Sequence, residues 1–184
     1  MENYKSLFWN KAMTWGALVG AALAAELLIA YFANTYFSPY RTYISWTIYI
    51  VGIYLGTTAF KKMVPENRPF TYGSALGFGT SIMLFSGIVS AVVTYLVFKF
   101  DVEFMDAFMV NVEEVLLNSG LSDSLIEQQI ALQKQMMTPA YVAFSQAFNV
   151  VFYGFLISLV SSIFLRKKNS GGFDEAMSEL DESN

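Results

Sequence analysis

One carboxyl group stands out in the apolar part of this sequence. Glu26 lies inside an apolar stretch from about residue 12 to residue 33, and no other charged residue falls inside the chain's four long apolar stretches. If such a stretch crosses a membrane, the carboxyl group is costly there and indicates a functional role by default. With no cation in these stretches to pair with it, the uncharged acid is favoured.

The fourth apolar stretch offers uncharged partners for Glu26. Its amide and hydroxyl side chains are Ser145, Gln146, Asn149 and Tyr153. Gln146, Asn149 and Tyr153 follow the spacing i, i+3, i+7, so they share one face of a helix. Three interpretations stay open for this polar cluster. Glu26 could be a hydrogen-bonded structural group, a proton- or cation-handling group, or a side chain exposed near the membrane surface.

The sequence lacks two residue types, and the motif spacings, that many catalytic and binding sites need. The chain has no Cys and no His, which removes thiolate and imidazole chemistry and the commonest metal ligands. Gly73, Gly77 and Gly79 lie inside an apolar stretch with no preceding strand, so they form no nucleotide fingerprint. The acidic segment 101–138 lacks the spacing of an EF-hand. We therefore expect no enzyme activity, no cofactor, no metal site and no nucleic-acid partner.

The elements that position these residues are apolar helices. The chain is 55% hydrophobic and only 14% charged, whereas a soluble domain carries about 25% charged residues. The apolar stretches cover about residues 12–33, 43–60, 72–98 and 140–165, close to the roughly 20 residues that a transmembrane helix needs. We predict an all-α polytopic membrane domain over residues 1–168, followed by a disordered acidic tail over 169–184. A competing interpretation of the first stretch is a signal peptide, cleaved near residues 22–24.

Basic residues predict the orientation of the four spans. One set of connections carries Lys5, Lys11, Lys61, Lys62, Arg68, Arg166, Lys167 and Lys168, and the other carries Arg41, Lys99 and Lys134. Because basic residues accumulate in cytoplasmic loops, we expect both termini in the cytoplasm.

The segment between the third and fourth spans predicts an extracytoplasmic helical hairpin at 101–138. Seven of its residues are acidic. Its first half carries an apolar face at helical spacing: Met105, Phe108, Met109, Val112, Val115 and Leu116. We expect helices at about 103–118 and 122–137, joined at Ser119-Gly120, with Ser124 and Glu127 as a capping box. This hairpin could be a structural cap or a surface that binds a protein partner.

Glycines at helical spacing indicate close packing between spans. They are Gly16 and Gly20 in the first span, Gly52 and Gly56 in the second, and Gly73 and Gly77 in the third. The first and third spans also open on a shared pattern, Thr-aromatic-Gly-small-x-x-Gly, at Thr14 and Thr71. An internal repeat of two helix pairs is one explanation, and the common need for small packing residues is the other.

Three segments resemble domain-of-unknown-function family 4199. They are RPFTYGSA at 68–75, YLVFKF at 95–100 before the acidic segment, and GFLISLV at 154–160 before a basic stop. The resemblance extends over essentially the whole chain and implies a small bacterial inner-membrane protein, with no catalytic residue to transfer. Members often place a proline just after the third span, where this chain has Asp101-Val102-Glu103. Whether the helix breaks there is open.

These features lead to one expected function and two alternatives. We expect a non-enzymatic accessory or scaffold protein of the bacterial inner membrane, in contact with the lipid bilayer. The first alternative is a small proton- or ion-coupled transporter or channel that uses Glu26. The second is a subunit of a larger envelope complex that binds through the segment 101–138.

Overall fold

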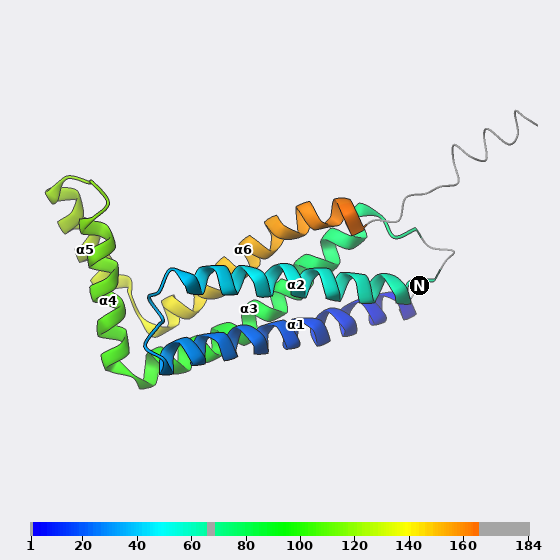
Figure 1. The fold of residues 1–184 in the computed structure, drawn as a ribbon, viewed down its shortest axis with the longest axis horizontal. Helices are drawn as coiled ribbons and strands as arrows, with labels where there is room; N and C mark the ends of the chain where they lie inside the picture. The colour runs from blue at the N-terminus through cyan, green and yellow to red at the C-terminus, as the bar shows by residue number, and fades with distance from the viewer. Residues whose placement is uncertain (1, 66–68, 166–184) are drawn as a thin grey trace, which may run out of the picture.

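The protein is all-helical throughout the part of the chain that the structure describes. The computed structural model describes residues 2–65 and 69–165. Figure 1 shows its six helices: α1 (Glu2–Phe32), α2 (Tyr40–Met63), α3 (Tyr72–Phe100), α4 (Val102–Leu117), α5 (Asp123–Met136) and α6 (Pro139–Leu165). The predicted tail 169–184 and the basic residues Arg68, Arg166, Lys167 and Lys168 lie outside the described residues.

Four of these helices are long and apolar enough to cross a membrane: α1, α2, α3 and α6. Even α2, with 24 residues, extends about 36 Å at 1.5 Å per residue, against a hydrocarbon core of about 30 Å. Each predicted span lies within one of these helices to within one residue at its ends. The architecture is that of a multi-pass membrane protein.

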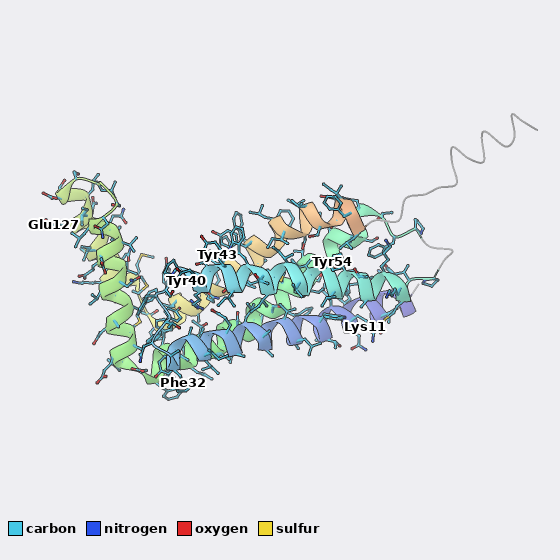
Figure 2. The ribbon with its side chains drawn as sticks, viewed as in Figure 1. Lys11, Phe32, Tyr40, Tyr43, Tyr54 and Glu127 are labelled. Atoms are coloured by element: carbon cyan, nitrogen blue, oxygen red, sulfur yellow. The ribbon has the colours of Figure 1, made fainter. Side chains whose placement is uncertain are left out.

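The four long helices form a bundle in which α3 is central, since it packs most extensively against α6 and α1. Figure 1 shows α4 and α5 at one end of the bundle, here called the α4–α5 end, and the start of α1 and the finish of α6 at the other, here called the N-terminal end. Lys11 on α1 lies toward the N-terminal end, and Glu127 on α5 lies at the opposite extreme (Figure 2).

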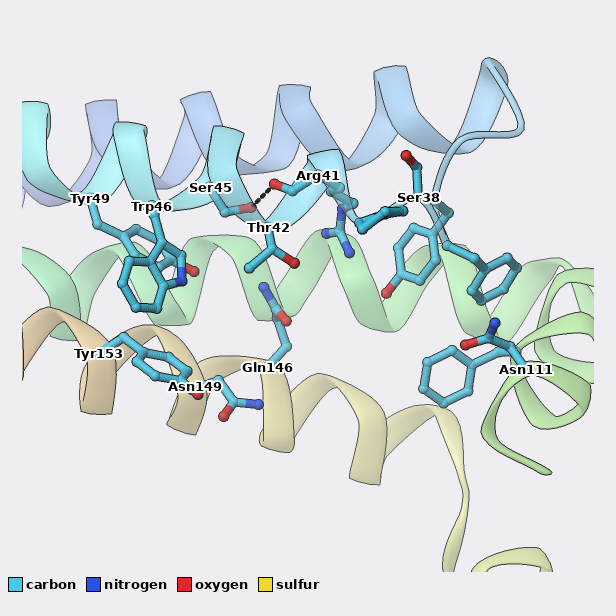
Figure 3. Close-up of a pocket in the computed structure, with 14 residues that line it drawn as sticks. Ser38, Arg41, Thr42, Ser45, Trp46, Tyr49, Asn111, Gln146, Asn149 and Tyr153 are labelled. Atoms are coloured by element: carbon cyan, nitrogen blue, oxygen red, sulfur yellow. Dashed lines mark hydrogen bonds between the residues drawn. The ribbon is translucent and has the colours of Figure 1, made fainter. Parts of the chain in front are cut away.

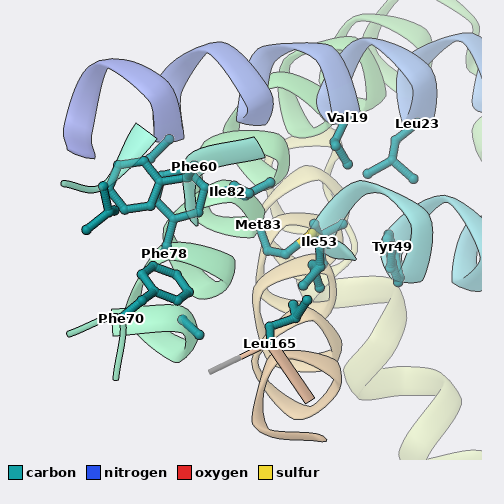
Figure 4. Packing of buried hydrophobic residues seen from close by; sticks show 14 residues of the cluster. Val19, Leu23, Tyr49, Ile53, Phe60, Phe70, Phe78, Ile82, Met83 and Leu165 are labelled. Atoms are coloured by element: carbon teal, nitrogen blue, oxygen red, sulfur yellow. The ribbon is translucent and has the colours of Figure 1, made fainter. Parts of the chain in front are cut away.

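Aromatic side chains close the bundle near its N-terminal end. Phe60 on α2 stacks on Phe78 of α3, with ring centroids 4.1 Å apart. Phe8 on α1 meets both rings edge-on, and Phe70 packs beside Phe60. Figure 4 shows this cluster continuing into Ile53, Ile82 and Met83 along the bundle. Because Phe60, Phe70 and Phe78 are fully buried, the N-terminal half of the bundle is tightly packed.

Small residues permit the close approach of α1 to α3. A Cβ atom added at Gly16 would lie 2.4 Å from Cβ of Phe85, and one at Gly20 would lie 2.6 Å from Cβ of Val89. The Ser86 hydroxyl uses this proximity to donate a hydrogen bond to the carbonyl oxygen of Gly16 at 3.0 Å. Neighbouring side chains are similarly close at Gly52 and Gly56 on α2.

Gly73 and Gly77 differ from the predicted packing positions. A Cβ at Gly77 would meet no atom within 4 Å, and one at Gly73 would meet only its own helix cap at 4.0 Å. The close contacts of α3 instead involve Gly79, beside Ser158 on α6, and Gly87, beside Ala147. The similar openings of the first and third spans therefore have unlike surroundings.

The chain turns from α3 into α4 at Asp101. Helix α3 ends at Phe100, and the Asp101 side chain accepts a hydrogen bond from the backbone N–H of Phe104 at 2.9 Å. It also accepts a hydrogen bond from the Tyr31 hydroxyl. An N-cap thus breaks the helix at Asp101 without a proline. These two hydrogen bonds hold the pKa of the Asp101 carboxyl below its usual range, that from Tyr31 being the larger cause.

Helices α4 and α5 lie at the positions of the two predicted helices, within one residue at each end. Gly120, with φ of +74°, lies in the turn between them, a conformation that favours glycine. Lys134 on α5 forms a 2.7 Å ion pair with Glu113 on α4. The predicted capping box is wrong: α5 begins at Asp123, so its N-cap is Ser122 rather than Ser124.

Candidate functional site

Glu26 is paired with a cation. Nε of Arg41 donates to Oε1 of Glu26 at 2.8 Å, and a terminal guanidinium nitrogen donates to Oε2 at 3.4 Å. The side chain of Arg41 is 18% exposed and that of Glu26 is 8% exposed, so the pair is largely buried. The expectation that Glu26 lacks a cationic partner is therefore wrong. Helix α2 begins at Tyr40 rather than near residue 43, which brings Arg41 into the bundle beside α1.

The loop between α1 and α2 positions Arg41 from a second side. The guanidinium carbon of Arg41 lies 4.2 Å from the centroid of the Tyr36 ring, within the range of a cation–π contact. Burial raises the pKa of the Tyr36 phenol, although Arg41 acts in the opposite direction. Tyr36 is therefore a neutral aromatic partner, and Arg41 is held between a carboxylate and a ring.

The amide-bearing face of α6 does not contact Glu26. Within the described residues, no hydrogen bond joins Glu26 to Gln146, Asn149 or Tyr153. These three side chains instead line a cavity of about 420 Å³ on the α6-facing side of α2. Figure 3 shows Gln146 pointing from α6 toward Thr42 on α2, with Tyr153 near Trp46 farther along the two helices. We call this cavity the α2–α6 groove.

Helix α2 supplies the opposite wall of the α2–α6 groove. Five of its lining side chains recur at i, i+1, i+4, i+5 and i+8 and therefore lie on one helix face: Arg41, Thr42, Ser45, Trp46 and Tyr49. Ser38, in the loop before α2, lines the groove beside them. The predicted second span begins at about residue 43, so Arg41 and Thr42 fall in the preceding connection and this face is not predicted. The spacing of polar and aromatic residues in 41–49 is the signal that could identify it.

Aromatic residues and α4 bound the two ends of the groove. The rings of Trp46 and Tyr153 lie 5.6 Å apart by their centroids and form the wall toward the middle of the bundle. At the α4–α5 end, Phe37 and Phe108 are among the lining residues, with Asn111 of α4 beside them. The groove therefore has an aromatic end and an end covered by α4.

A second cavity, of about 630 Å³, lies between α1 and α2. Its walls are mostly apolar and include Ala22, Ile29 and Ile48. Of these two cavities, Glu26 lines the second and not the α2–α6 groove, whereas Arg41 and Ser38 line both. Arg41 thus separates an apolar cavity on the α1 side from the polar α2–α6 groove.

The side chains of the groove are suited to hydrogen bonding rather than to bond-making chemistry. They offer amides, hydroxyls, an indole N–H and one guanidinium group that is already paired with Glu26. In residues 2–65 and 69–165, no three His, Cys, Asp or Glu side chains lie close enough together to hold a metal ion. The arrangement can bind and orient a polar group.

Comparison with known proteins assigns the chain to a family. Residues 14–167 match the family described as protein of unknown function (DUF4199). The chain belongs to the DUF4199 family. The match runs from α1 to the end of α6 and so includes the groove and the Glu26–Arg41 pair, which confirms the resemblance drawn from the sequence. Searches of curated proteins and of solved structures found nothing similar to this DUF4199 chain.

Proposed function

We propose that this DUF4199 protein is a non-enzymatic accessory protein of the bacterial inner membrane. In this proposal α1, α2, α3 and α6 cross the membrane, both termini are cytoplasmic, and α4 and α5 form an extracytoplasmic hairpin. Support comes from the separation of charge along the bundle: Lys5, Lys11, Lys61 and Lys62 belong to its N-terminal end. Acidic residues predominate in the α4–α5 segment.

The single observation that carries the accessory role is the pairing of Glu26 with Arg41. A proton-handling carboxyl group must be able to bind and release its proton, whereas a neighbouring guanidinium stabilises the carboxylate. The aromatic cluster around Phe60 and Phe78 also closes the bundle between the groove and its N-terminal end. Both features favour a structural Glu26 over a transport pathway.

Proton flux into liposomes tests this proposal against the transporter alternative. The purified full-length protein is reconstituted, a pH gradient is imposed, and flux is compared with that of protein-free liposomes. We expect no added flux from the wild type or from Glu26→Gln. A wild-type flux that disappears in Glu26→Gln, with thermal stability unchanged, would contradict the accessory role.

A subunit of a larger envelope complex is the second candidate, and it rests on exposed apolar side chains of α4, α5 and their connection. Val110, Leu117, Leu121, Leu125 and Leu132 are all exposed there. Cross-linking in native membranes from a photoreactive residue at Leu125 tests this candidate, with Glu127 as the matched polar position. A cross-linked protein specific to Leu125 would favour the complex, and equal yields at the two positions would count against it.

A further inference from the structure

The amides of the α2–α6 groove, from half-buried Gln146 and exposed Asn149, are accessible to an occupant of the groove. Gln146 and Asn149 follow the start of α6 by seven and ten residues, which places them about 10 and 15 Å along the helix from its outer end. Neither side chain forms a hydrogen bond within the described residues. In the membrane placement proposed above, polar groups left unsatisfied at this depth are costly. The groove therefore favours an occupant that offers hydrogen-bonding atoms.

The polar side chains of the groove are rich in donors. Two side-chain amides, the Thr42 hydroxyl and the Trp46 indole N–H can all donate. An occupant that carries acceptors, such as ester carbonyls and phosphate oxygens, satisfies the N–H and O–H donors of these groups. The cavity volume of about 420 Å³ is sufficient for the polar part of one lipid molecule, within the usual range of small-molecule sites.

Arg41 has N–H donors left for an oxygen-rich group of the occupant. Its guanidinium group has five N–H donors, and the hydrogen bonds to Glu26 engage only Nε and one terminal nitrogen. The remaining donors belong to a side chain that also lines the groove. A guanidinium group matches phosphate oxygens closely. Because Glu26 already neutralises Arg41, and no second cation lines the groove, a single phosphate fits better than a polyanion.

The order of groups along the groove matches the order of groups in one class of lipid. Arg41 is the second residue of α2, at the α4–α5 end of the bundle, and the two amides lie deeper. Beyond them, Trp46 and Tyr153 present aromatic surface toward the middle of the bundle. A glycerophospholipid has its phosphate outermost, its ester carbonyls deeper, and its acyl chains toward the bilayer centre.

We propose that the α2–α6 groove binds one glycerophospholipid from the leaflet at the α4–α5 end. Arg41 donates to its phosphate, and Gln146 and Asn149 donate to its ester carbonyls. The acyl chains leave the groove past Trp46 and Tyr153. This binding site is independent of the accessory role proposed above, because it concerns the groove and not the Glu26 proton or α5.

Lipid binding by the delipidated full-length protein in detergent tests the proposal. Native mass spectrometry is used to titrate phosphatidylglycerol, diacylglycerol with the same acyl chains, and soluble glycerol phosphate. We expect phosphatidylglycerol to bind at least tenfold more tightly than diacylglycerol, and glycerol phosphate to bind more weakly than both. The double variant Gln146→Leu/Asn149→Leu should weaken phosphatidylglycerol binding about tenfold, the effect of two lost hydrogen bonds.

A matched pair on α2 keeps the test valid if the double variant fails to fold. Thr42 lines the groove, whereas Thr47 is exposed on the same helix outside it. Thr42→Val should weaken phosphatidylglycerol binding severalfold, and Thr47→Val should leave it unchanged. Equal affinities of these two variants would overturn the proposal. Tight binding of glycerol phosphate would also overturn the proposal, because it indicates a site for free anions. A lipid-free dimer that dissociates in Thr42→Val would overturn it as well, because it indicates that a second copy of the chain occupies the groove.

Discussion

Arg41 on α2 and Glu26 on α1 form a bidentate ion pair, with donor–acceptor distances of 2.8 and 3.4 Å. The pair joins two antiparallel neighbours next to their connecting loop, and the two opposite charges form a neutral unit. Two charges in a membrane are tolerated when they satisfy one another. The pair also turns the remaining donors of Arg41 toward the α2–α6 groove, which links the fold of α1 and α2 to the binding surface on α6.

Gly16 should tolerate a side chain poorly. In Gly16→Ala, the new Cβ would meet Cβ of Phe85 at 2.4 Å and the carbonyl oxygen of Ile82 at 2.9 Å. We expect the free energy of unfolding to fall by about 1–3 kcal/mol, the usual cost of overpacking. Gly77→Ala is the control, because its Cβ would enter open space and alanine favours a helix. Denaturant unfolding in detergent measures both, and equal losses would contradict the packing described for α1 and α3.

The junction of α3 and α4 should be sensitive to pH through Asp101. Its pKa is lowered in the folded protein by hydrogen bonds from Tyr31 and Phe104. A lowered pKa contributes stability that is present above the unfolded value, about 3.9, and is lost as the pH falls through the folded value. We expect hydrogen exchange at the junction to accelerate as the pH falls below about 4, after correction for the intrinsic exchange rate.

Two variants check the origin of this pH dependence. Asp101→Asn should show fast exchange at the junction already at neutral pH, with little further change on acidification. Asp106→Asn is the control, because Asp106 is exposed on α4 and has no hydrogen-bond partner among the described residues. If Asp106→Asn removes the pH dependence and Asp101→Asn retains it, the assignment to Asp101 is wrong.

Phe108 should anchor α4 to the bundle. Its ring lies 5.2 Å from Phe98 of α3 and 6.5 Å from Tyr36, between ring centroids. Phe108→Glu places a charge in this aromatic contact, so we expect α4 to detach and its amide protection to fall at least tenfold. Val110→Glu is the matched control, since Val110 is exposed. Hydrogen exchange detected by mass spectrometry compares the two, and unchanged protection in Phe108→Glu would count against the contact.

The distribution of basic residues predicts the topology. Reporter fusions after residue 184 and at Gly120, in the turn between α4 and α5, report on which side of the membrane each position lies. We expect a periplasm-active reporter to function at residue 120 and to fail at residue 184, because basic residues favour the cytoplasmic side. Activity at residue 184 would reject the proposed orientation, as would inactivity at residue 120.

Much of the fold was predictable from the sequence because apolar length and periodicity depend on local residues. The four long helices and the two shorter ones follow from apolar length and periodicity. The partner of Glu26 could not be predicted in this way, because the predicted span begins near residue 43 and leaves Arg41 in a loop, whereas α2 begins at Tyr40. Gly16 and Gly73 share a local pattern, yet only Gly16 faces another helix closely. Which face meets which neighbour depends on the tertiary packing of the bundle.

The groove could not be predicted from the sequence alone, because its walls come from α2 and α6 and their relative position depends on tertiary packing. The spacing of Gln146, Asn149 and Tyr153 correctly places them on one helix face, since all three line the groove. Their predicted contact with Glu26 is absent, because α2 carries a polar face of its own between α1 and α6. The periodic run from Arg41 to Tyr49 indicates that face only when its first residues are assigned to the helix.

A double-mutant cycle on Glu26 and Arg41 tests most directly the claim that the Glu26 carboxyl group has a structural role. The free energy of unfolding in detergent is measured for wild type, Glu26→Gln, Arg41→Gln and the double variant. Each single variant should lose about 1–3 kcal/mol, because it leaves one largely buried charge unpaired. The double variant should lose less than the sum of the two, with a coupling energy of at least about 1 kcal/mol. Additive losses, or a Glu26→Gln protein as stable as the wild type, would contradict the structural ion pair.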